Sequence, residues 1–254
     1  AKAAVKSGTA LSGVDGGDRS RAGKGGKPFD GMNGIAANLL LNLTSSVRFH
    51  GELNVDLNEI TTNLVPFPNL HFLLSSMAPL VLPSDLARQK AGAGPRNVDA
   101  MFTDAFAREH QLIKADPRRS TYLACALLLR GDVTITDVSR NVARLKPGLR
   151  MVSWNTEGFK LGMCTTPPVG LPYSLLCLSN NCAIRHTFER MRERHRTLRQ
   201  RSLFLHHYEQ FMDVADMDLA ADRIDNLVAE YAAADAPPQA HPTPRLEPMG
   251  VPLG

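Results

Sequence analysis

The sequence has 254 residues, of which 43% are hydrophobic and 21% are charged, and this composition is typical of a folded protein rather than a disordered one. The net charge is +4, but residues 1–27 carry six basic and two acidic side chains, so residues 28–254 are neutral, with 23 of each sign. Because the positive charge belongs to one terminal segment, the composition argues against a broad nucleic-acid-binding surface, and no apolar run reaches the roughly 18 residues of a membrane helix.

Both ends of the chain are predicted to be disordered. Residues 1–27 hold seven of the 19 glycines, and residues 235–254 hold six of the 17 prolines. Segments of this kind cannot bury enough apolar surface to fold.

A long helix is predicted over residues 28–51. Pro28 suits a first helical turn, and apolar residues follow at helical spacing from Phe29 to Val47. The apolar face is wide, so we expect this helix to be central and buried on several sides. A second helix is predicted from about Leu53 to Leu64.

The middle of the chain alternates between strand-like and helical patterns. Helices are predicted at about residues 98–106 and 137–145, and strands at residues 70–74, 122–129, 151–154, 159–164 and 174–178. Nearly continuous apolar strands between helices indicate the α/β class. Residues 81–96 lack periodicity and are predicted to form a long exposed loop.

Two helices are predicted near the end, at about residues 184–201 and 215–233. The first region carries seven arginines, and the second carries five acids and one base. The arginines could bind a phosphate backbone, form a solvated face, or pair with the acidic helix in a hairpin. Charge runs on helices are usually solvated or paired, which favours the last two interpretations.

Four cysteines are spaced for neither a disulfide scaffold nor a zinc knuckle, and no metal site is predicted. We interpret them as buried thiols of a reducing compartment, and they are Cys125, Cys164, Cys177 and Cys182.

Two pairs of residues are candidates for functional roles. Asp56 and Glu59 share a face near a helix start, where they either complement the helix dipole or allow Glu59 to orient or deprotonate a water. Phe29 and Asn33 also share a helix face. They are either a core aromatic and a capping or buried amide, or a ring that stacks on a base and an amide that reads the edge of that base.

Several stretches of the sequence carry a family resemblance. They include MNGI at 32–35, SVRFHGELNVDL at 46–57, TNLVPFPNLHF at 62–72, VSW at 152–154, PPVG at 167–170 and FLHHY at 204–208. Taken together, they resemble the tubulin superfamily over roughly residues 28–233. Within it the sequence is most similar to the epsilon-tubulin branch, on residues 38–46, 104–112 and 145–147.

The resemblance implies a domain order. A long central helix (28–51) would precede an intermediate α/β domain (52–182), a two-layer sandwich with a mixed sheet, and an antiparallel pair of C-terminal helices (183–234) would follow. Residues 1–27 would be a basic, glycine-rich insertion, and residues 235–254 a proline-rich tail.

The resemblance also implies a nucleotide. The glycine-rich phosphate loop of tubulins is not found in this sequence, so we expect the N-terminal nucleotide domain to be absent and the chain to be the later part of a longer protein. GTP and Mg would bind the full-length form, whereas this part alone would not hold GTP firmly, because backbone amides of the absent domain supply most phosphate contacts. Phe29 matches the aromatic that stacks on guanine, and Asn33 matches the asparagine that hydrogen-bonds the base.

Asp56 and Glu59 match the acidic pair of the alpha-type subunit. There, the second acid positions the water that attacks the GTP of the neighbouring subunit. Glu59 is therefore predicted to complete a hydrolytic site in trans. Whether the protein is an enzyme stays open, since hydrolysis would need the absent domain and a neighbouring subunit.

The implied function is that of a structural constituent of the microtubule cytoskeleton, in centriole and basal-body assembly and triplet microtubules. The expected location is the cytoplasm, cytoskeleton, centrosome, centriole, basal body and cilium. Expected partners are other tubulin subunits, in longitudinal contacts and, through residues 81–96, lateral ones, and centriole proteins, but neither nucleic acid nor membrane. Two alternatives stay open: a gamma-like or delta-like tubulin in nucleation, and a basic nucleic-acid-binding module.

Overall fold

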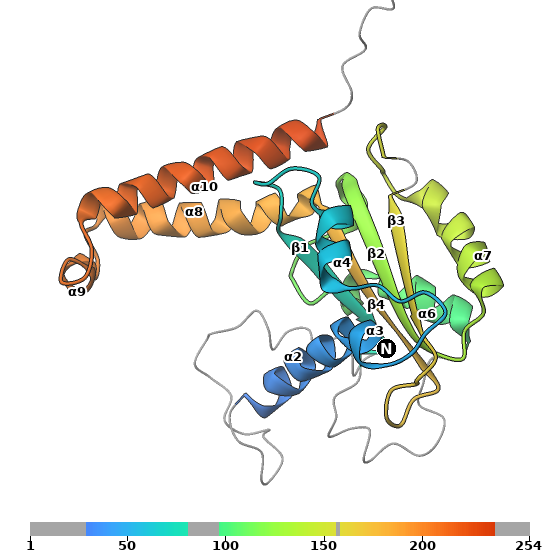
Figure 1. The fold of residues 1–254 in the computed structure, drawn as a ribbon. Coiled ribbons are helices and arrows are strands. Elements are labelled where there is room, and N and C mark those ends of the chain that lie inside the picture. The colour runs from blue at the N-terminus through green and yellow to red at the C-terminus, as the bar shows by residue number, and fades with distance from the viewer. Residues whose placement is uncertain (1–28, 81–96, 156–157, 237–254) are drawn as a thin grey trace, which may run out of the picture.

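The structure, a computed structural model, describes residues 29–80, 97–155 and 158–236 (Figure 1). It confirms the predicted α/β class, because helices cover both faces of one four-stranded mixed sheet. A helical hairpin extends from one end of the sheet. The predictions for residues 1–27 and 81–96, and for most of the tail, lie outside the described residues.

The sheet has the strand order β1-β4-β2-β3. β4 is antiparallel to both of its neighbours, and β3 is parallel to β2. All ten residues of β2 are buried, which explains its continuous apolar sequence. The strands are β1 (Leu73–Ala78), β2 (Tyr122–Gly131), β3 (Phe159–Cys164) and β4 (Tyr173–Asn181).

Helices pack on the two faces of this sheet. One face is covered by α6 (Val98–Ala105) and α7 (Ile135–Leu145), and the other by α2 (Asp30–Leu43), α3 (Ser45–Arg48) and α4 (Leu57–Leu64). Alternate residues of β2 point to opposite faces of the sheet. Leu127 therefore packs in the hydrophobic cluster on the α6–α7 face, and Leu128 packs in the cluster on the other face. The 3₁₀ turns are η1 (Arg108–His110), η2 (Pro117–Arg119), η3 (Lys146–Gly148) and η4 (Cys182–Ile184).

One predicted strand is wrong. Residues Met151–Trp154 make only an isolated bridge, between Tyr122 and Met151. The chain turns away from the sheet immediately afterwards, since Asn155 N–H donates to the carbonyl of Val152 at 3.3 Å. β3 has the predicted limits, whereas β1 begins and ends later than predicted.

The predicted long helix is interrupted at Thr44, which separates α2 from α3. The hydroxyls of Thr44 and Ser45 donate to the carbonyls of Leu40 at 2.8 Å and Asn42 at 2.7 Å, a local competition with backbone bonding that often bends helices. The expectation that this helix is buried on several sides is also wrong here. Asn42 is the one buried residue of α2, and Leu40 and Leu41 are at least half exposed.

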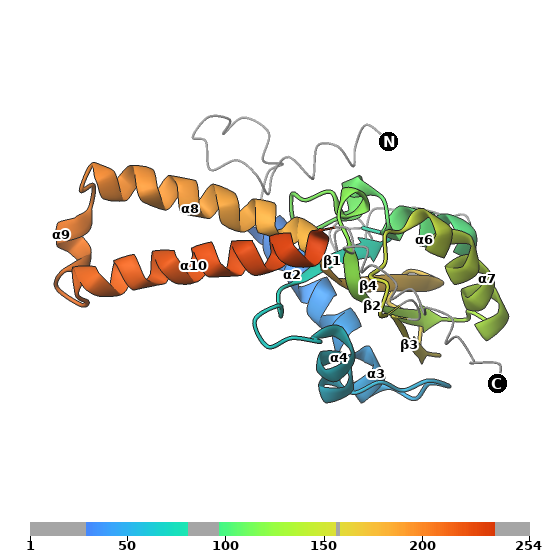
Figure 2. The same ribbon diagram turned by 90° about the horizontal axis from the view of Figure 1, so that it is seen from above.

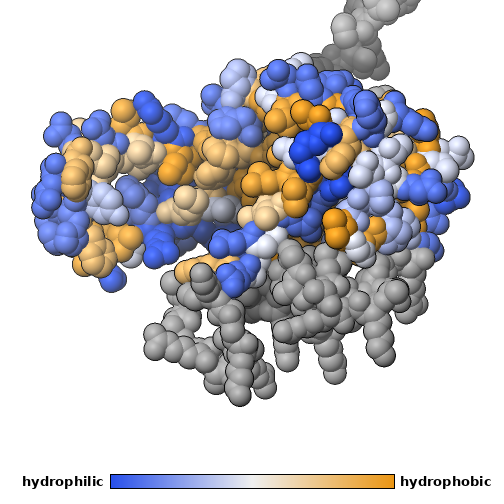
Figure 3. All heavy atoms as spheres, turned by 60° about the horizontal axis from the view of Figure 1, so that its bottom comes forward, coloured by the Kyte–Doolittle hydropathy of each residue, from blue (hydrophilic) through white to orange (hydrophobic). Residues whose placement is uncertain are grey.

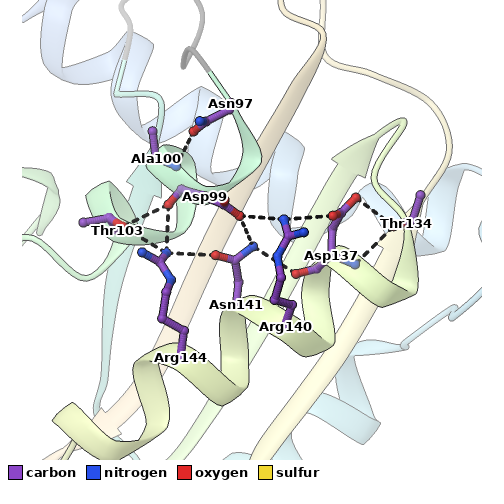
Figure 4. Close-up of polar contacts among 9 residues, drawn as sticks. All are labelled: Asn97, Asp99, Ala100, Thr103, Thr134, Asp137, Arg140, Asn141 and Arg144. Carbon is purple, nitrogen blue, oxygen red and sulfur yellow. Dashed lines mark hydrogen bonds and ion pairs between the residues drawn. The ribbon is translucent and has the colours of Figure 1, made fainter.

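A polar network joins α6 to α7 (Figure 4). The Asp99 carboxylate accepts hydrogen bonds from Asn141 at 2.7 Å and Arg140 at 2.9 Å. These bonds lower the pKa of Asp99, and the bond from Asn141 has the largest effect. Arg144 donates to the Asp99 carbonyl at 3.0 Å and to Thr103 at 3.1 Å, so one helix is tied to the other at several points.

The hairpin consists of α8 (Arg185–Gln200), α9 (Leu205–Tyr208) and α10 (Val214–Asp235), with α8 and α10 side by side (Figure 2). Four ion pairs join the two long helices, and this confirms the interpretation that their charges offset each other. The pairs are Arg185–Asp235 at 3.5 Å, Arg192–Asp225 at 3.2 Å, Arg196–Asp225 at 2.7 Å and Arg199–Asp218 at 3.0 Å.

The end of α10 is anchored to the sheet. The fully buried Tyr231 accepts a hydrogen bond from the Phe72 N–H at 3.2 Å, just before β1. Asp235 accepts from the Thr121 N–H at 2.8 Å and pairs with Arg185 at 3.5 Å. In Figure 3, hydrophobic side chains gather where the hairpin meets the body of the molecule.

All four cysteines are buried and free, as predicted. Across the described ranges, no helix is long and apolar enough to cross a bilayer. The same ranges contain no group of three or more His, Cys, Asp or Glu side chains placed to hold a metal ion.

Candidate functional site

Asp56 caps the start of α4. Its backbone is extended, and its carboxylate accepts a hydrogen bond from the Glu59 N–H at 2.6 Å. This bond satisfies one of the N–H groups that a helix start leaves without a partner. The geometry therefore gives Asp56 a structural role at the position where the sequence also allowed a functional one.

Glu59 is the residue of this pair whose side chain reaches across to another element. Its Oε1 accepts an ion-paired hydrogen bond from the Lys160 ammonium group on β3. The Glu59 side chain is 41% exposed and that of Lys160 is 29% exposed, so the pair lies at the surface. Sequence reasoning missed Lys160, because no local pattern connects residues 101 positions apart.

A small polar cavity lies beside this ion pair. Its volume is about 80 Å³, and Asn63, Asn155 and Lys160 contribute to its lining. Cys125 also contributes, but a hydrogen bond with Cys177 and burial hold its pKa well above the ordinary value. The Cys125 thiol therefore stays protonated at neutral pH and is a poor nucleophile.

Two exposed aromatic side chains lie next to α4. The rings of Phe67 and Trp154 meet edge to face, with centroids 5.9 Å apart, and the side chains are 51% and 56% exposed. Large exposed aromatics that touch one another are typical of protein-binding surfaces. We call the surface formed by Asp56, Glu59, Asn63, Phe67, Trp154 and Lys160 the α4 face.

A groove continues from the α4 face toward the hairpin. Its volume is about 510 Å³, and it lies between the Leu149–Trp154 segment and Ala233, Ala234 and Ala236 at the end of α10. Trp154 thus borders both surfaces.

Phe29 and Asn33 lie elsewhere, at the start of α2, away from α4 in both ribbon views (Figures 1 and 2). The Phe29 side chain is 68% exposed, and its backbone carbonyl accepts the Asn33 N–H at 2.9 Å. Both side chains are exposed, so a ring face and an amide are available to a ligand at one helix start.

The four predicted site residues therefore form two separate groups. Phe29 and Asn33 make one, and Asp56 and Glu59, with Lys160, make the other.

Comparison with known proteins identifies related sequences. The Tubulin C-terminal domain family matches residues 68–193. The chain is 50% identical to the Tubulin epsilon chain of Mus musculus over 229 residues, which is 89% of this chain and 47% of that protein. It is 51% identical to the Tubulin epsilon chain of Homo sapiens over 212 residues, which is 83% of this chain and 44% of that protein.

A third relative is covered over most of its own length. The Tubulin alpha chain of Pneumocystis carinii is 36% identical over 190 residues, which is 71% of this chain and 87% of that protein. By contrast, the chain spans about half the length of the two epsilon relatives.

Proposed function

This chain belongs to the tubulin superfamily and is epsilon-like, and from this premise we propose that its full-length form is a GTP-binding structural subunit of microtubules in centrioles and basal bodies. Its partners in this proposal are other tubulin subunits and centriole proteins. The α4 face is the surface that docks on the nucleotide end of the next subunit.

The observation that carries the proposal is the Glu59 carboxylate at the surface of the α4 face. Asp56 caps the helix start, so the first turn that holds Glu59 is well ordered. Lys160 occupies Oε1 of Glu59, and Oε2 remains able to accept a hydrogen bond from water. The exposed Phe67 and Trp154 rings of the α4 face supply apolar area for a protein contact.

The proposed chemistry is the ordering of a water in trans. Docking would exclude bulk solvent, and the Glu59 carboxylate would then accept a hydrogen bond from the water facing the neighbouring subunit's nucleotide. Lys160 balances the charge of Glu59 at this contact. GTP supplies a phosphoanhydride bond that water can cleave.

The full-length protein would also bind a nucleotide of its own, separate from that of the neighbouring subunit. Phe29 and Asn33 would hold guanine by stacking and hydrogen bonding. Stacking contributes only about 1–3 kcal/mol, so phosphate contacts from residues beyond the described ranges would supply the remaining affinity.

The nucleic-acid alternative loses its main support in the hairpin. Four of the seven arginines in and just after α8, namely Arg185, Arg192, Arg196 and Arg199, pair with aspartates of α10.

The test is GTP turnover by full-length protein assembled with its polymer partner. We expect Glu59→Ala to lower turnover roughly 100-fold or more, in the range of general acid–base contributions. Glu109→Ala, at an exposed acid of η1, is the matched control and should leave turnover unchanged. Unchanged turnover in Glu59→Ala polymers would overturn the assignment.

A further inference from the structure

Helix α8 carries two rows of arginines on opposite sides. The inner row faces α10, and the outer row faces solvent. At about 100° per residue, each row stays within a narrow sector of the helix, and the two sectors are roughly opposite each other. The inner row is Arg192, Arg196 and Arg199, and the outer row is Arg190 and Arg194, which Arg201 continues at the C-cap directly after the helix.

The outer row has no carboxylate partner among the described residues. All three of its side chains are exposed. Arg190 donates to the carbonyls of His186 at 3.2 Å and Lys114 at 3.3 Å, which orients its guanidinium without neutralising it. Within the part of the chain that the structure describes, the Arg194 and Arg201 side chains make no hydrogen bond or ion pair.

The inner row shows what such a row binds. Asp225 accepts from Arg192 at 3.2 Å and from Arg196 at 2.7 Å, so one carboxylate joins two guanidinium groups. Asp218 accepts two bonds from Arg199, at 3.0 and 3.2 Å. Forked donors matched to carboxylates are the strongest common use of arginine in proteins.

The outer row repeats this chemistry toward solvent, and we propose that it docks a carboxylate-rich polypeptide segment of another protein. Arg190 and Arg201 are about 16 Å apart along the helix, the length of about five residues of extended chain. Such a segment would place successive acidic side chains against the three guanidinium groups. This interaction surface is independent of the α4 face.

The charge pattern favours an acidic peptide over nucleic acid. DNA carries one charge per roughly 1.7 Å, a density that three arginines over a length of about 16 Å do not match. Glu193 lies beside Arg194 in the sequence and would repel a phosphate backbone. The one aromatic of α8, Phe188, packs against Phe72, with ring centroids 4.7 Å apart, so it is not available to stack on bases.

The experiment measures binding of a fluorescently labelled polyglutamate peptide to the chain by anisotropy, at low salt and at about 0.15 M ionic strength. We expect saturable binding that weakens with salt. The double variant Arg194→Gln with Arg201→Gln should bind about tenfold more weakly. It should keep the fold, because among the described residues these side chains make no hydrogen bond or ion pair and both are exposed. Arg223→Gln, an exposed arginine of α10, is the matched control and should bind like the parent chain.

Four results would overturn the proposal. Three are an absence of saturable peptide binding at low salt, equal loss of binding in Arg223→Gln, and tighter binding of an oligonucleotide of the same charge that depends on the same arginines. The fourth is self-association of the chain that the double variant abolishes, because a second copy would then be the occupant. Thermal unfolding of each variant, expected to match the parent, confirms that the hairpin is intact.

Discussion

The Lys160 ammonium group pairs with the Glu59 carboxylate across 101 positions of sequence, and it joins the first turn of α4 to β3. An ion pair at the surface contributes only about 0–1 kcal/mol to stability. Its main effect is therefore to hold one carboxylate oxygen in place at the α4 face.

Replacing Lys160 separates this positioning effect from stability. Lys160→Met should change the free energy of unfolding by less than about 1 kcal/mol. In full-length polymers, Lys160→Met should lower GTP turnover, though less than Glu59→Ala does. Lys160→Arg should keep most of the parent turnover. If Lys160→Met polymers turn over GTP at the parent rate, Lys160 does not position Glu59.

The capping role of Asp56 predicts a specific pattern of stability. Asp56→Ala should destabilise the chain by about 1 kcal/mol, because the Glu59 N–H loses its acceptor. Asp56→Ser and Asp56→Asn keep an acceptor and should stay within a few tenths of a kcal/mol of the parent. Urea unfolding of the chain measures all three. A large loss in the serine variant would show that Asp56 acts through its charge rather than as a cap.

Asp99 predicts acid sensitivity in the α6–α7 contact. Hydrogen bonds from Asn141 and then Arg140 lower its pKa from 3.8 in the folded state. A carboxyl group whose pKa is lower in the folded state stabilises the fold at pH values above its unfolded-state pKa. This contribution disappears as the pH falls through the folded-state pKa.

The parent chain should therefore exceed Asp99→Asn in stability most clearly at about pH 6, with the difference shrinking below about pH 4. Urea midpoints across that range provide the measurement. Asp132→Asn, at an exposed aspartate near the end of β2, is the matched control. A parent-to-variant difference that is constant with pH would contradict the role of Asp99 ionisation.

Asn42 is expected to be the most sensitive polar position of α2. It is buried and accepts hydrogen bonds from Arg130 at 3.4 Å and Ser174 at 3.3 Å, and it donates to Asn38 at 3.1 Å. Asn42→Ala should cost about 1–3 kcal/mol, because buried polar groups lose their partner.

Asn58→Ala, an exposed asparagine on α4, is the comparison and should have little effect. Urea unfolding measures both variants. Equal urea midpoints for the two variants would contradict this prediction, because they would show that water can replace the Asn42 side chain without loss of stability.

Some features of this fold follow from short stretches of sequence. The largely apolar run Phe159–Cys164, interrupted by Lys160, specified β3 at its limits. The charges of α8 and α10 favoured a paired hairpin, since arginines recur along α8 and aspartates recur along α10. The sequence also placed Asp56 near a helix start, as an acid that could complement the helix dipole, but its capping bond to Glu59 was seen only in the structure.

Other features depend on contacts that no local pattern contains. The strand-like run Met151–Trp154 leaves the sheet after one bridge, and Trp154 instead meets Phe67 at the surface. The apolar pattern of α2 correctly indicated a helix but not its exposure, because burial depends on what packs over the helix.

By itself, the sequence determined the class of fold, the family resemblance, the hairpin and the residue types available for chemistry. Local spacing carries this information, since it sets which side chains share a face of one helix or strand. Only the tertiary structure decided that Lys160 meets Glu59, that Phe67 meets Trp154, and that one row of α8 arginines is paired while the other faces solvent. Those relationships join segments far apart in the chain, and they exist only once the sheet order β1-β4-β2-β3 brings the segments together.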